Sequence, residues 1–168
     1  TITLDESSSL KIDEGATLTY NGTALSVEND QTLTLSGNGT WDGSGAITLA
    51  GGTLSVADTP TLDSSSGILV TADSTISIAN TLSGSAGIAI NSDSTLTLSG
   101  GGTLDNSSDL SVNSTSATLN LSDISTVGYV DLVNGTLLVP NTTTITNFFN
   151  SSGGSATIKI KAKNMISG

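Results

Sequence analysis

Two acidic pairs near the N-terminus are the first residues whose types and spacing could do chemistry. Asp5 stands next to Glu6, and Asp13 stands next to Glu14. Paired carboxyl groups can act as general acid and base, or as acid and nucleophile in the cleavage of a glycosidic bond. The chain has no histidine and no arginine, and three of its four lysines lie together near the C-terminus. No cluster of basic residues therefore accompanies the acids, and the sequence predicts a protein that is not an enzyme.

Calcium binding is the second chemistry to consider, because many aspartates fall at predicted turns. None of them lies in a GGxGxDxUx nonapeptide or in an EF-hand loop, and the absence of cysteine and histidine removes the usual zinc ligands. We therefore predict no metal and no cofactor, with solvated turn carboxylates as the expected state and calcium at a turn as the alternative. The aspartates concerned are Asp42, Asp58, Asp63, Asp73, Asp93, Asp105 and Asp109.

Charge and composition exclude other classes of partner. The formal net charge is −11, from 15 acids against four lysines. Binding to nucleic acid needs a basic face, so we expect no nucleic-acid partner. The longest apolar runs are far too short to span a bilayer, which predicts no membrane insertion. About a third of the residues are Ser or Thr and only 3% are aromatic, which favours a stacked architecture with a narrow aliphatic core.

The elements that carry these residues are short strands, because apolar residues alternate with period two. The strands recur in three interleaved columns, at steps of 18 to 23 residues. The first column is Ile12, Leu33, Leu54, Ile76, Leu96, Leu119, Leu137 and Ile158. The second is Leu25, Ile47, Ile68, Ile88, Leu110 and Val130. The third is Leu18, Trp41, Leu62, Leu82, Leu104, Ile124 and Ile145.

Three strands per repeat of about 21 residues predict a three-sided parallel β-solenoid. Residues 1–168 are expected to form a single all-β domain of about eight coils, with a β-sandwich as the alternative. Stacking at about 4.8 Å per coil gives a rod of roughly 40 Å. Gly, Asn and Asp occupy the predicted corners, where a tight turn or a positive φ is needed.

The segment "TLTLSGNGTWDGSGAITLAGGTLSV", residues 32–56, resembles the strand repeats in the passenger regions of autotransporter adhesins and related bacterial surface solenoids. The resemblance covers about residues 15–125. It implies a secreted, elongated protein at the cell surface. The location expected from it is extracellular.

Two surface patterns add further hypotheses. Threonines precede seven of the eight residues of the first column, at 32, 53, 75, 95, 118, 136 and 157. Such an array resembles the face of an ice-binding solenoid, although Thr also suits any outward strand position. Eight asparagines begin N-x-S/T sequons, which marks candidate glycosylation sites and covalent glycans. They are Asn21, Asn38, Asn106, Asn113, Asn120, Asn134, Asn141 and Asn150.

The two ends differ in charge. Asp5, Glu6, Asp13 and Glu14 lie in the first predicted coil, whereas Lys159, Lys161 and Lys163 lie in the last strand. Neither end carries a recognisable cap, so both are expected to expose unpaired strand edges. Acidic and basic edges on one rod favour head-to-tail addition of identical subunits, which gives a fibre.

The predicted function is therefore a structural subunit of an extracellular filament that binds copies of itself. These seven charged residues are its expected interface. The alternatives are an adhesin passenger segment that binds glycan or protein, an ice-binding solenoid, a polysaccharide-cleaving enzyme, and a piece of a longer solenoid whose charges serve solubility.

Overall fold

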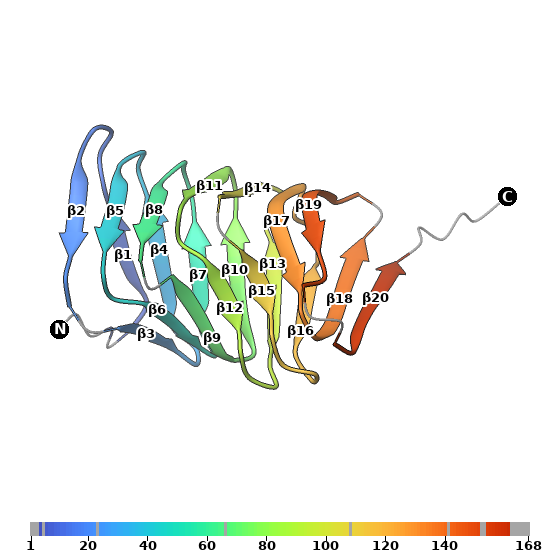
Figure 1. Ribbon diagram of the computed structural model, residues 1–168. Helices are drawn as coiled ribbons and strands as arrows, with labels where there is room; N and C mark the ends of the chain where they lie inside the picture. The colour runs from blue at the N-terminus through green and yellow to red at the C-terminus, as the bar shows by residue number, and fades with distance from the viewer. Residues whose placement is uncertain are drawn as a thin grey trace, which may run out of the picture.

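The computed structural model describes residue 4 and residues 6–22, 24–65, 67–107, 109–140, 142–151 and 154–161. These residues form a parallel β-solenoid of about seven turns, with about 22 residues per turn and no helix (Figure 1). The predicted fold class is confirmed. The coil count is slightly lower than the eight expected, because the strand Ala156–Lys161 (β20) begins a turn that the described residues do not complete.

Three short strands per turn build three faces, here named A, B and C. Face A is an eight-stranded sheet. Its strands are β1 (Ser8–Lys11), β4 (Thr32–Ser36), β7 (Thr53–Val56), β10 (Ser74–Ile78), β13 (Thr95–Ser99), β16 (Thr118–Leu121), β18 (Gly135–Pro140) and β20. Face B contains β2 (Thr17–Tyr20), β5 (Thr40–Gly43), β8 (Thr61–Ser64), β11 (Thr81–Gly84), β14 (Thr103–Asn106) and β19 (Thr144–Phe149). Face C contains β3 (Leu25–Glu28), β6 (Ile47–Ala50), β9 (Ile68–Ala72), β12 (Ile88–Ile90) and β15 (Leu110–Val112).

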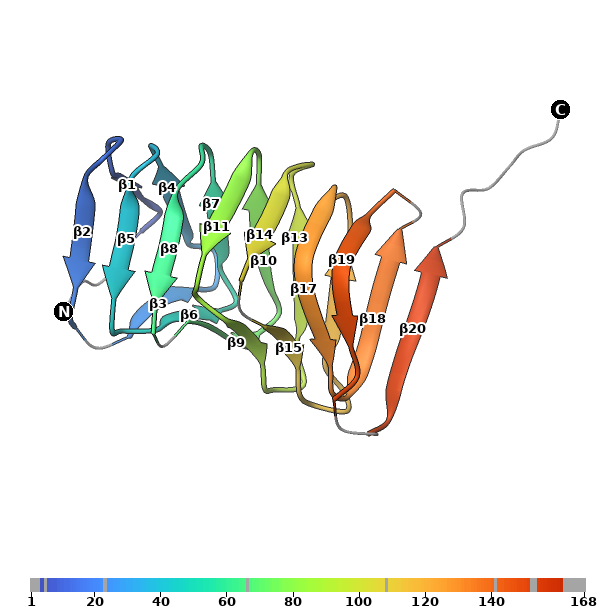
Figure 2. The same ribbon diagram turned by 45° about the horizontal axis from the view of Figure 1, so that its top comes forward.

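One long strand joins faces B and C. The strand β17 (Thr126–Leu132) pairs with β14 through its first residues and with β15 through its last. The two faces therefore form one twelve-stranded sheet, whose twelfth strand, β19, pairs with β17 off the main strand order (Figure 2). From this point each turn has two longer strands in place of three short ones, so the cross-section of the solenoid changes near its C-terminal end.

The core is a stack of aliphatic side chains rather than a central cluster. On face C the register places Leu25, Ile47, Ile68, Ile88, Leu110 and Val130 side by side, which confirms the whole predicted second column. All six are almost completely buried. Full burial of one such side chain stabilises the fold by about 1.5–3 kcal/mol. Each coil therefore depends on its two neighbours for its share of the core.

Faces A and B depart from the predicted columns at specific steps. On face A, Leu10 rather than Ile12 lies in the first strand and pairs with Leu35. Ile76 pairs with Leu98, whereas Leu96 pairs with Ser74. On face B, Leu104 pairs with Val127 and not with Ile124. Several of these shifts are of an even number of residues, so they keep apolar side chains inside.

A bulge and a buried serine accompany the shift on face A. In β9, Val70 pairs with Leu49 but Ala72 pairs with Ala50, so Thr71 is an extra residue. The chain then enters β10 with Ser74 at an inward position. The Ser74 hydroxyl donates to the Ala72 carbonyl at 2.8 Å and accepts from the Gly51 N–H at 3.1 Å. The hydroxyl both donates and accepts a hydrogen bond, so its burial in the core carries little energetic cost.

Glycine is required where a corner touches the coil below it. At Gly37, φ is +80°, and a Cβ would lie 2.1 Å from the carbonyl oxygen of Ile12. At Gly100, φ is +98°, and a Cβ would lie 2.6 Å from the carbonyl oxygen of Ile78. Backbones of adjacent coils approach closely at these corners, so only a residue without a side chain fits. The predicted use of glycine at the corners is confirmed at both positions.

Candidate functional site

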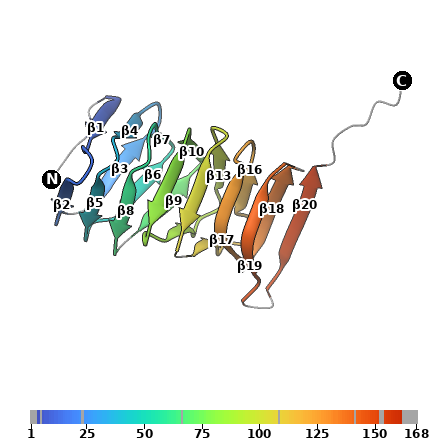
Figure 3. The same ribbon diagram turned by 90° about the horizontal axis from the view of Figure 1, so that it is seen from above.

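The two described ends of the chain lie at opposite ends of the rod. Seen from above, the coils follow one another in a row from β1, β2 and β3 to β20 (Figure 3). The acidic and the basic residues singled out in the sequence therefore belong to different ends of the molecule. They do not meet within one copy.

The C-terminal end exposes an incomplete core. Four large apolar side chains of the described chain are exposed, and all four lie in β19 and β20: Phe148 (41%), Phe149 (46%), Ile158 (50%) and Ile160 (73%). Ile158 pairs with buried Leu137, and Phe148 pairs with buried Val130. Both therefore stand at core-facing positions that the next coil of a solenoid would cover. Among the described residues, no strand pairs with the outer edge of β20.

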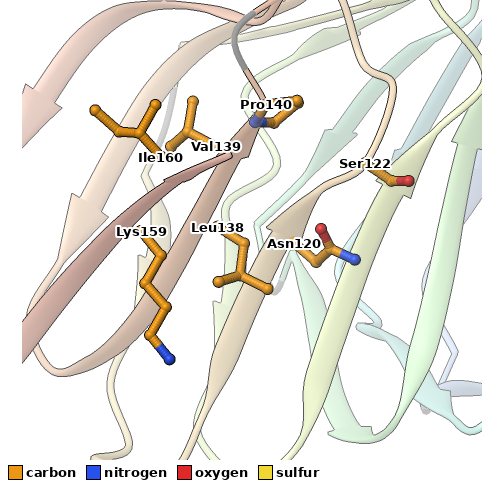
Figure 4. A pocket seen from close by; sticks show the side chains of 7 residues that line it. All are labelled: Asn120, Ser122, Leu138, Val139, Pro140, Lys159 and Ile160. Atoms are coloured by element: carbon orange, nitrogen blue, oxygen red, sulfur yellow. The ribbon is translucent and has the colours of Figure 1, made fainter. Parts of the chain in front are cut away.

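A groove of about 430 Å³ adjoins this end on face A. Leu138, Val139, Pro140 and Ile160 supply its apolar lining, and Lys159 adds a positive charge (Figure 4). Leu138 is the outward neighbour of Lys159 in the sheet register. The groove therefore combines apolar surface with a cation, next to a strand edge that pairs only with β18 among the described residues.

A pair of aromatic rings completes the surface of this end on face B. Tyr129 and Phe149 are stacked, with ring centroids 4.8 Å apart and an angle of 16° between the ring planes. The pKa of Tyr129 is raised above its ordinary value, mainly because partial burial disfavours the phenolate and also because Asp109 and Asp131 are negatively charged. Asp131 is itself buried and accepts hydrogen bonds from the Ser151 N–H and hydroxyl.

The N-terminal end is partly capped, a feature that the sequence did not predict. Leu4 and Tyr20 are each 8% exposed. The Gln31 side chain donates to the Leu4 carbonyl at 2.8 Å, and the Ser7 hydroxyl accepts from the Thr32 N–H at 3.0 Å. Leu4 thus joins the core at this end as a partial cap, whereas Leu10 and Leu18 of the first coil remain half-buried. This partial cap was not predicted, because one leucine ahead of a strand is not a recognisable capping motif.

Aromatic packing strengthens this partly capped end. Tyr20 meets the only tryptophan, Trp41, edge to face, with ring centroids 5.9 Å apart. Trp41 is 1% exposed and stands next to Leu18 and Leu62 in the face B register. The first two coils are therefore joined by the largest buried side chain of the core.

The predicted acidic interface residues that the structure describes are exposed. They are Glu6, Asp13 and Glu14, whereas Asp5 lies outside the described residues. Asp13 forms an ion pair with Lys11 on β1, with Nζ 2.6 Å from Oδ1. The hydrogen bond to Asp13 and its negative charge raise the pKa of Lys11. One cation therefore lies within the acidic end, and it was not part of the predicted interface.

The predicted basic interface is described in part. Lys159 is exposed on β20 beside the groove. For Lys161 the backbone of β20 is described but the side chain is not, and Lys163 lies outside the described residues. No acid follows Asp131 in the sequence, so the last turns carry only positive side-chain charge.

The turn aspartates accept hydrogen bonds from neighbouring coils. Asp58 accepts from the Gly37 N–H at 2.8 Å, Asp73 from the Thr95 N–H at 2.7 Å, and Asp63 from both the N–H and the hydroxyl of Ser85. Each bond bridges about one coil of sequence. Carboxylates that accept backbone N–H groups make strong hydrogen bonds. These acids therefore link coils, which the expectation of merely solvated carboxylates missed.

The described residues contain no group of three or more acidic, histidine or cysteine side chains placed to hold a metal ion. Within the same part of the chain, no helix is long and apolar enough to cross a membrane.

The predicted sequons differ widely in their surroundings. Asn106 is 7% exposed, and its amide donates to the Tyr129 carbonyl and accepts from the Tyr129 N–H, both at 3.1 Å. A glycan at Asn106 would break this corner. Asn21, Asn38, Asn113 and Asn150 are exposed, Asn120 and Asn134 are half-buried, and Asn141 lies outside the described residues.

The predicted threonine column is not a single row. The register places Thr32, Thr53, Thr75 and Thr97 in one row of face A. A second row contains Thr95, Thr118, Thr136 and Thr157. The first row continues into Asn120, Leu138 and Lys159, so the flat array expected of an ice-binding face is interrupted after four strands.

Comparisons with known proteins gave no match to this chain, whether with protein families, with curated proteins or with solved structures. The fold itself is a parallel β-solenoid, as the repeats predicted.

Proposed function

We propose that this protein is a structural subunit of an extracellular filament, in which copies stack head to tail. The observation that carries the proposal is the gathering of Phe148, Phe149, Ile158 and Ile160 at one end of the rod. Monomeric soluble proteins seldom leave a contiguous group of large apolar side chains exposed without a use for it. A second copy offers strand edges of matching spacing, because both partners are built from the same coils.

Charge complementarity supports the head-to-tail direction. Residues 1–31 contain six acids and one lysine, whereas residues after 131 contain three lysines and no acid. Two C-terminal ends facing each other would bring the lysines together. Lys159 of one copy facing Glu6 and Glu14 of the next would give opposite charges across the joint, which favours encounter and sets polarity.

The proposed joint adds the first coil of one copy to β20 and β19 of the preceding copy. Strand addition at an open edge supplies backbone hydrogen bonds, while side chains at alternate positions supply specificity. Ile158 and Ile160 would then lie under the cap around Leu4. Head-to-tail contacts of this kind do not close on themselves and so produce a fibre. Glycans on exposed sequons such as Asn38 and Asn113 would coat the flanks and leave the joint free.

Sedimentation and light scattering over a range of concentrations test this proposal, with the Ile160→Ser variant and a matched control. Ile160 is 73% exposed, so its replacement should leave the fold intact and abolish assembly. Leu69→Ser makes the same type of change on the outer side of face C, in the middle of the rod, and should assemble like the unchanged protein. Equal assembly of both variants, or discrete dimers in place of fibres, would contradict the proposal.

A second candidate is an adhesin segment that binds a ligand along its flank. A groove of about 500 Å³ runs beside face C over several coils, with Gly67, Leu69, Gly87 and Ala89 among its lining residues. Asn91 and Asp109 add polar groups. Binding of glycans by the monomer, lost in Ala89→Arg but kept in Ile160→Ser, would favour this candidate over the filament.

A further inference from the structure

The sequence contains three Asn-Gly-Thr segments, at residues 21–23, 38–40 and 134–136. An Asn-Gly bond is prone to a reaction of its own, because glycine has no side chain to shield its backbone nitrogen. That nitrogen can attack the Asn side-chain carbonyl carbon when both groups are free to approach. The three segments share their residue types, so differences in their reactivity must come from the fold.

Two of the three segments are held by neighbouring coils. The Gly39 N–H donates to the Ile12 carbonyl at 2.9 Å, and the Asn38 amide oxygen accepts from the Thr59 N–H and hydroxyl. Attack at Asn38 would require the loss of these bonds.

The Asn-Gly-Thr segment at residues 134–136 is held in the same manner. The Gly135 N–H donates to the Ser155 carbonyl at 3.1 Å, and the Asn134 side chain donates to the Asn113 carbonyl at 3.0 Å. Gly135 is also buried, with a φ of +77°. Both reacting groups of this segment are therefore engaged in bonds to other coils.

Asn21-Gly22 is different. Among the described residues, neither the Asn21 side chain nor the Gly22 N–H has a hydrogen-bond partner, and Asn21 is exposed in the connection between β2 and β3. A Cβ at Gly22 would lie 2.5 Å from the Tyr20 ring, so a larger residue that would slow the attack does not fit without movement of that ring.

We propose that Asn21 is a site of spontaneous deamidation, and that the fold protects Asn38 and Asn134 from the same reaction. The Gly22 nitrogen loses its proton and forms a bond to the Asn21 side-chain carbonyl carbon, and the bond to the amide nitrogen breaks. That nitrogen leaves as ammonia with the proton, which gives a five-membered succinimide. Water then opens the ring to aspartate or isoaspartate. The net change is one water consumed and one ammonia released, and the new carboxyl group then loses a proton to solvent, which leaves one more negative charge on the protein.

The location gives this reaction a consequence for charge. Asn21 belongs to the first coil. The exposed acids at this end of the rod already give it a negative charge. Deamidation would add another carboxylate there with no enzyme involved. Deamidation at Asn21 requires no contact between copies of the chain, so it would occur in a monomer as well as in a filament.

Peptide mapping by mass spectrometry tests the proposal directly. The unglycosylated protein is incubated in mildly alkaline buffer, and isoaspartate and aspartate are followed at the three sites over time. Protection at Asn38 and Asn134 depends on at least two hydrogen bonds each, so Asn21 should react faster by about tenfold or more. The Asn21→Gln variant should lose the fast phase and keep the slow ones.

The same protein in denaturant is the control. Without the inter-coil bonds, all three sites should react at comparable rates, which would assign the folded-state difference to structure. Comparable rates at the three sites in the folded protein would overturn the proposal. Faster deamidation at Asn38 or Asn134 than at Asn21 in the folded protein would also overturn it. Filament formation enters none of these readouts, so failure of the filament proposal would leave them unchanged.

Discussion

The two ends of this solenoid are made from the same repeat, yet their described apolar side chains are covered to different extents. At the N-terminal end, Leu4 and Tyr20 cover the first coil and Tyr20 packs against Trp41. At the C-terminal end, Ile158 and Ile160 also occupy inward positions, but no described strand pairs with the outer edge of β20 to cover them. The repeat therefore accounts for the stacking of the coils, whereas the burial of apolar side chains at the N-terminal end depends on residues such as Leu4 and Tyr20 that lie outside the predicted columns.

The largest expected difference between the two ends is in how much their aromatic side chains contribute to the stability of the fold. Trp41→Ala should destabilise the fold by about 3–5 kcal/mol, because a fully buried aromatic side chain leaves a cavity between two coils. Phe149→Ala should cost about 1 kcal/mol or less, since the ring is 46% exposed and loses mainly its stacking on Tyr129. Chemical denaturation measures both, and similar losses for the two variants would mean that the ends are not different in packing.

The cap itself gives the next largest effect. Leu4→Ala should destabilise the first coil by about 2 kcal/mol, near the lower limit for a buried leucine because the site is at the surface of the stack. Ile160→Ala should change stability by less than about 0.5 kcal/mol, as an exposed position does. Hydrogen exchange of β1 and β20 would report each change locally. If Leu4→Ala left the exchange of β1 unaltered, the N-terminal end would not be capped by this residue.

Two neighbouring aspartates between the ends allow a test of whether hydrogen bonds from a turn carboxylate to the next coil stabilise the fold. Asp42 and Asp63 are neighbours on β5 and β8. Asp63→Ala should cost about 1–3 kcal/mol because the N–H and hydroxyl of Ser85 lose their acceptor. Asp42→Ala should be neutral or slightly stabilising, since exposed Asp42 has no hydrogen bond within the described chain and lies beside another carboxylate. Thermal unfolding of both variants decides the matter; equal destabilisation would rule out a special role for Asp63.

The smallest effect concerns pH at the C-terminal end. Because the pKa of Tyr129 is raised above its ordinary value of about 10, the folded state favours the neutral phenol. Its contribution to stability is complete below pH 10 and is lost as the pH rises through the folded-state pKa. Ultraviolet titration, with Tyr129→Phe to assign the signal, should show ionisation of Tyr129 above pH 10. Ionisation at a lower pH would mean that partial burial and the charges of Asp109 and Asp131 do not raise the pKa of this ring.

Much of the fold could be predicted from the sequence, because period two and a repeat of about 21 residues leave few architectures. The face C column was correct at every step from Leu25 to Val130. The errors on faces A and B came from register. On face A, a shift of two residues preserves the inward and outward pattern, so Leu96 and Leu98 are equally good partners for Ile76 by pattern alone. Only the bulge at Thr71 and the buried hydroxyl of Ser74 distinguish them.

The candidate site was predicted less completely. The charge difference between the ends is a property of the sequence and could be found there. The cap around Leu4 could not, because it depends on how Gln31 reaches the Leu4 carbonyl from a position 27 residues later. Lys11 was overlooked for a related reason, since its pairing with Asp13 becomes visible only when β1 and the following turn are in place.

Negative-stain electron microscopy of the purified chain at high concentration tests the central claim most directly. Head-to-tail stacking predicts thin, unbranched fibres of uniform width with an axial repeat near the length of one rod, roughly 35–40 Å for about seven turns and the joint. It also predicts that the Ile160→Ser variant shows only single rods under the same conditions. Isolated short rods of the unchanged protein at every concentration, or pairs joined end to end that never extend, would contradict the account.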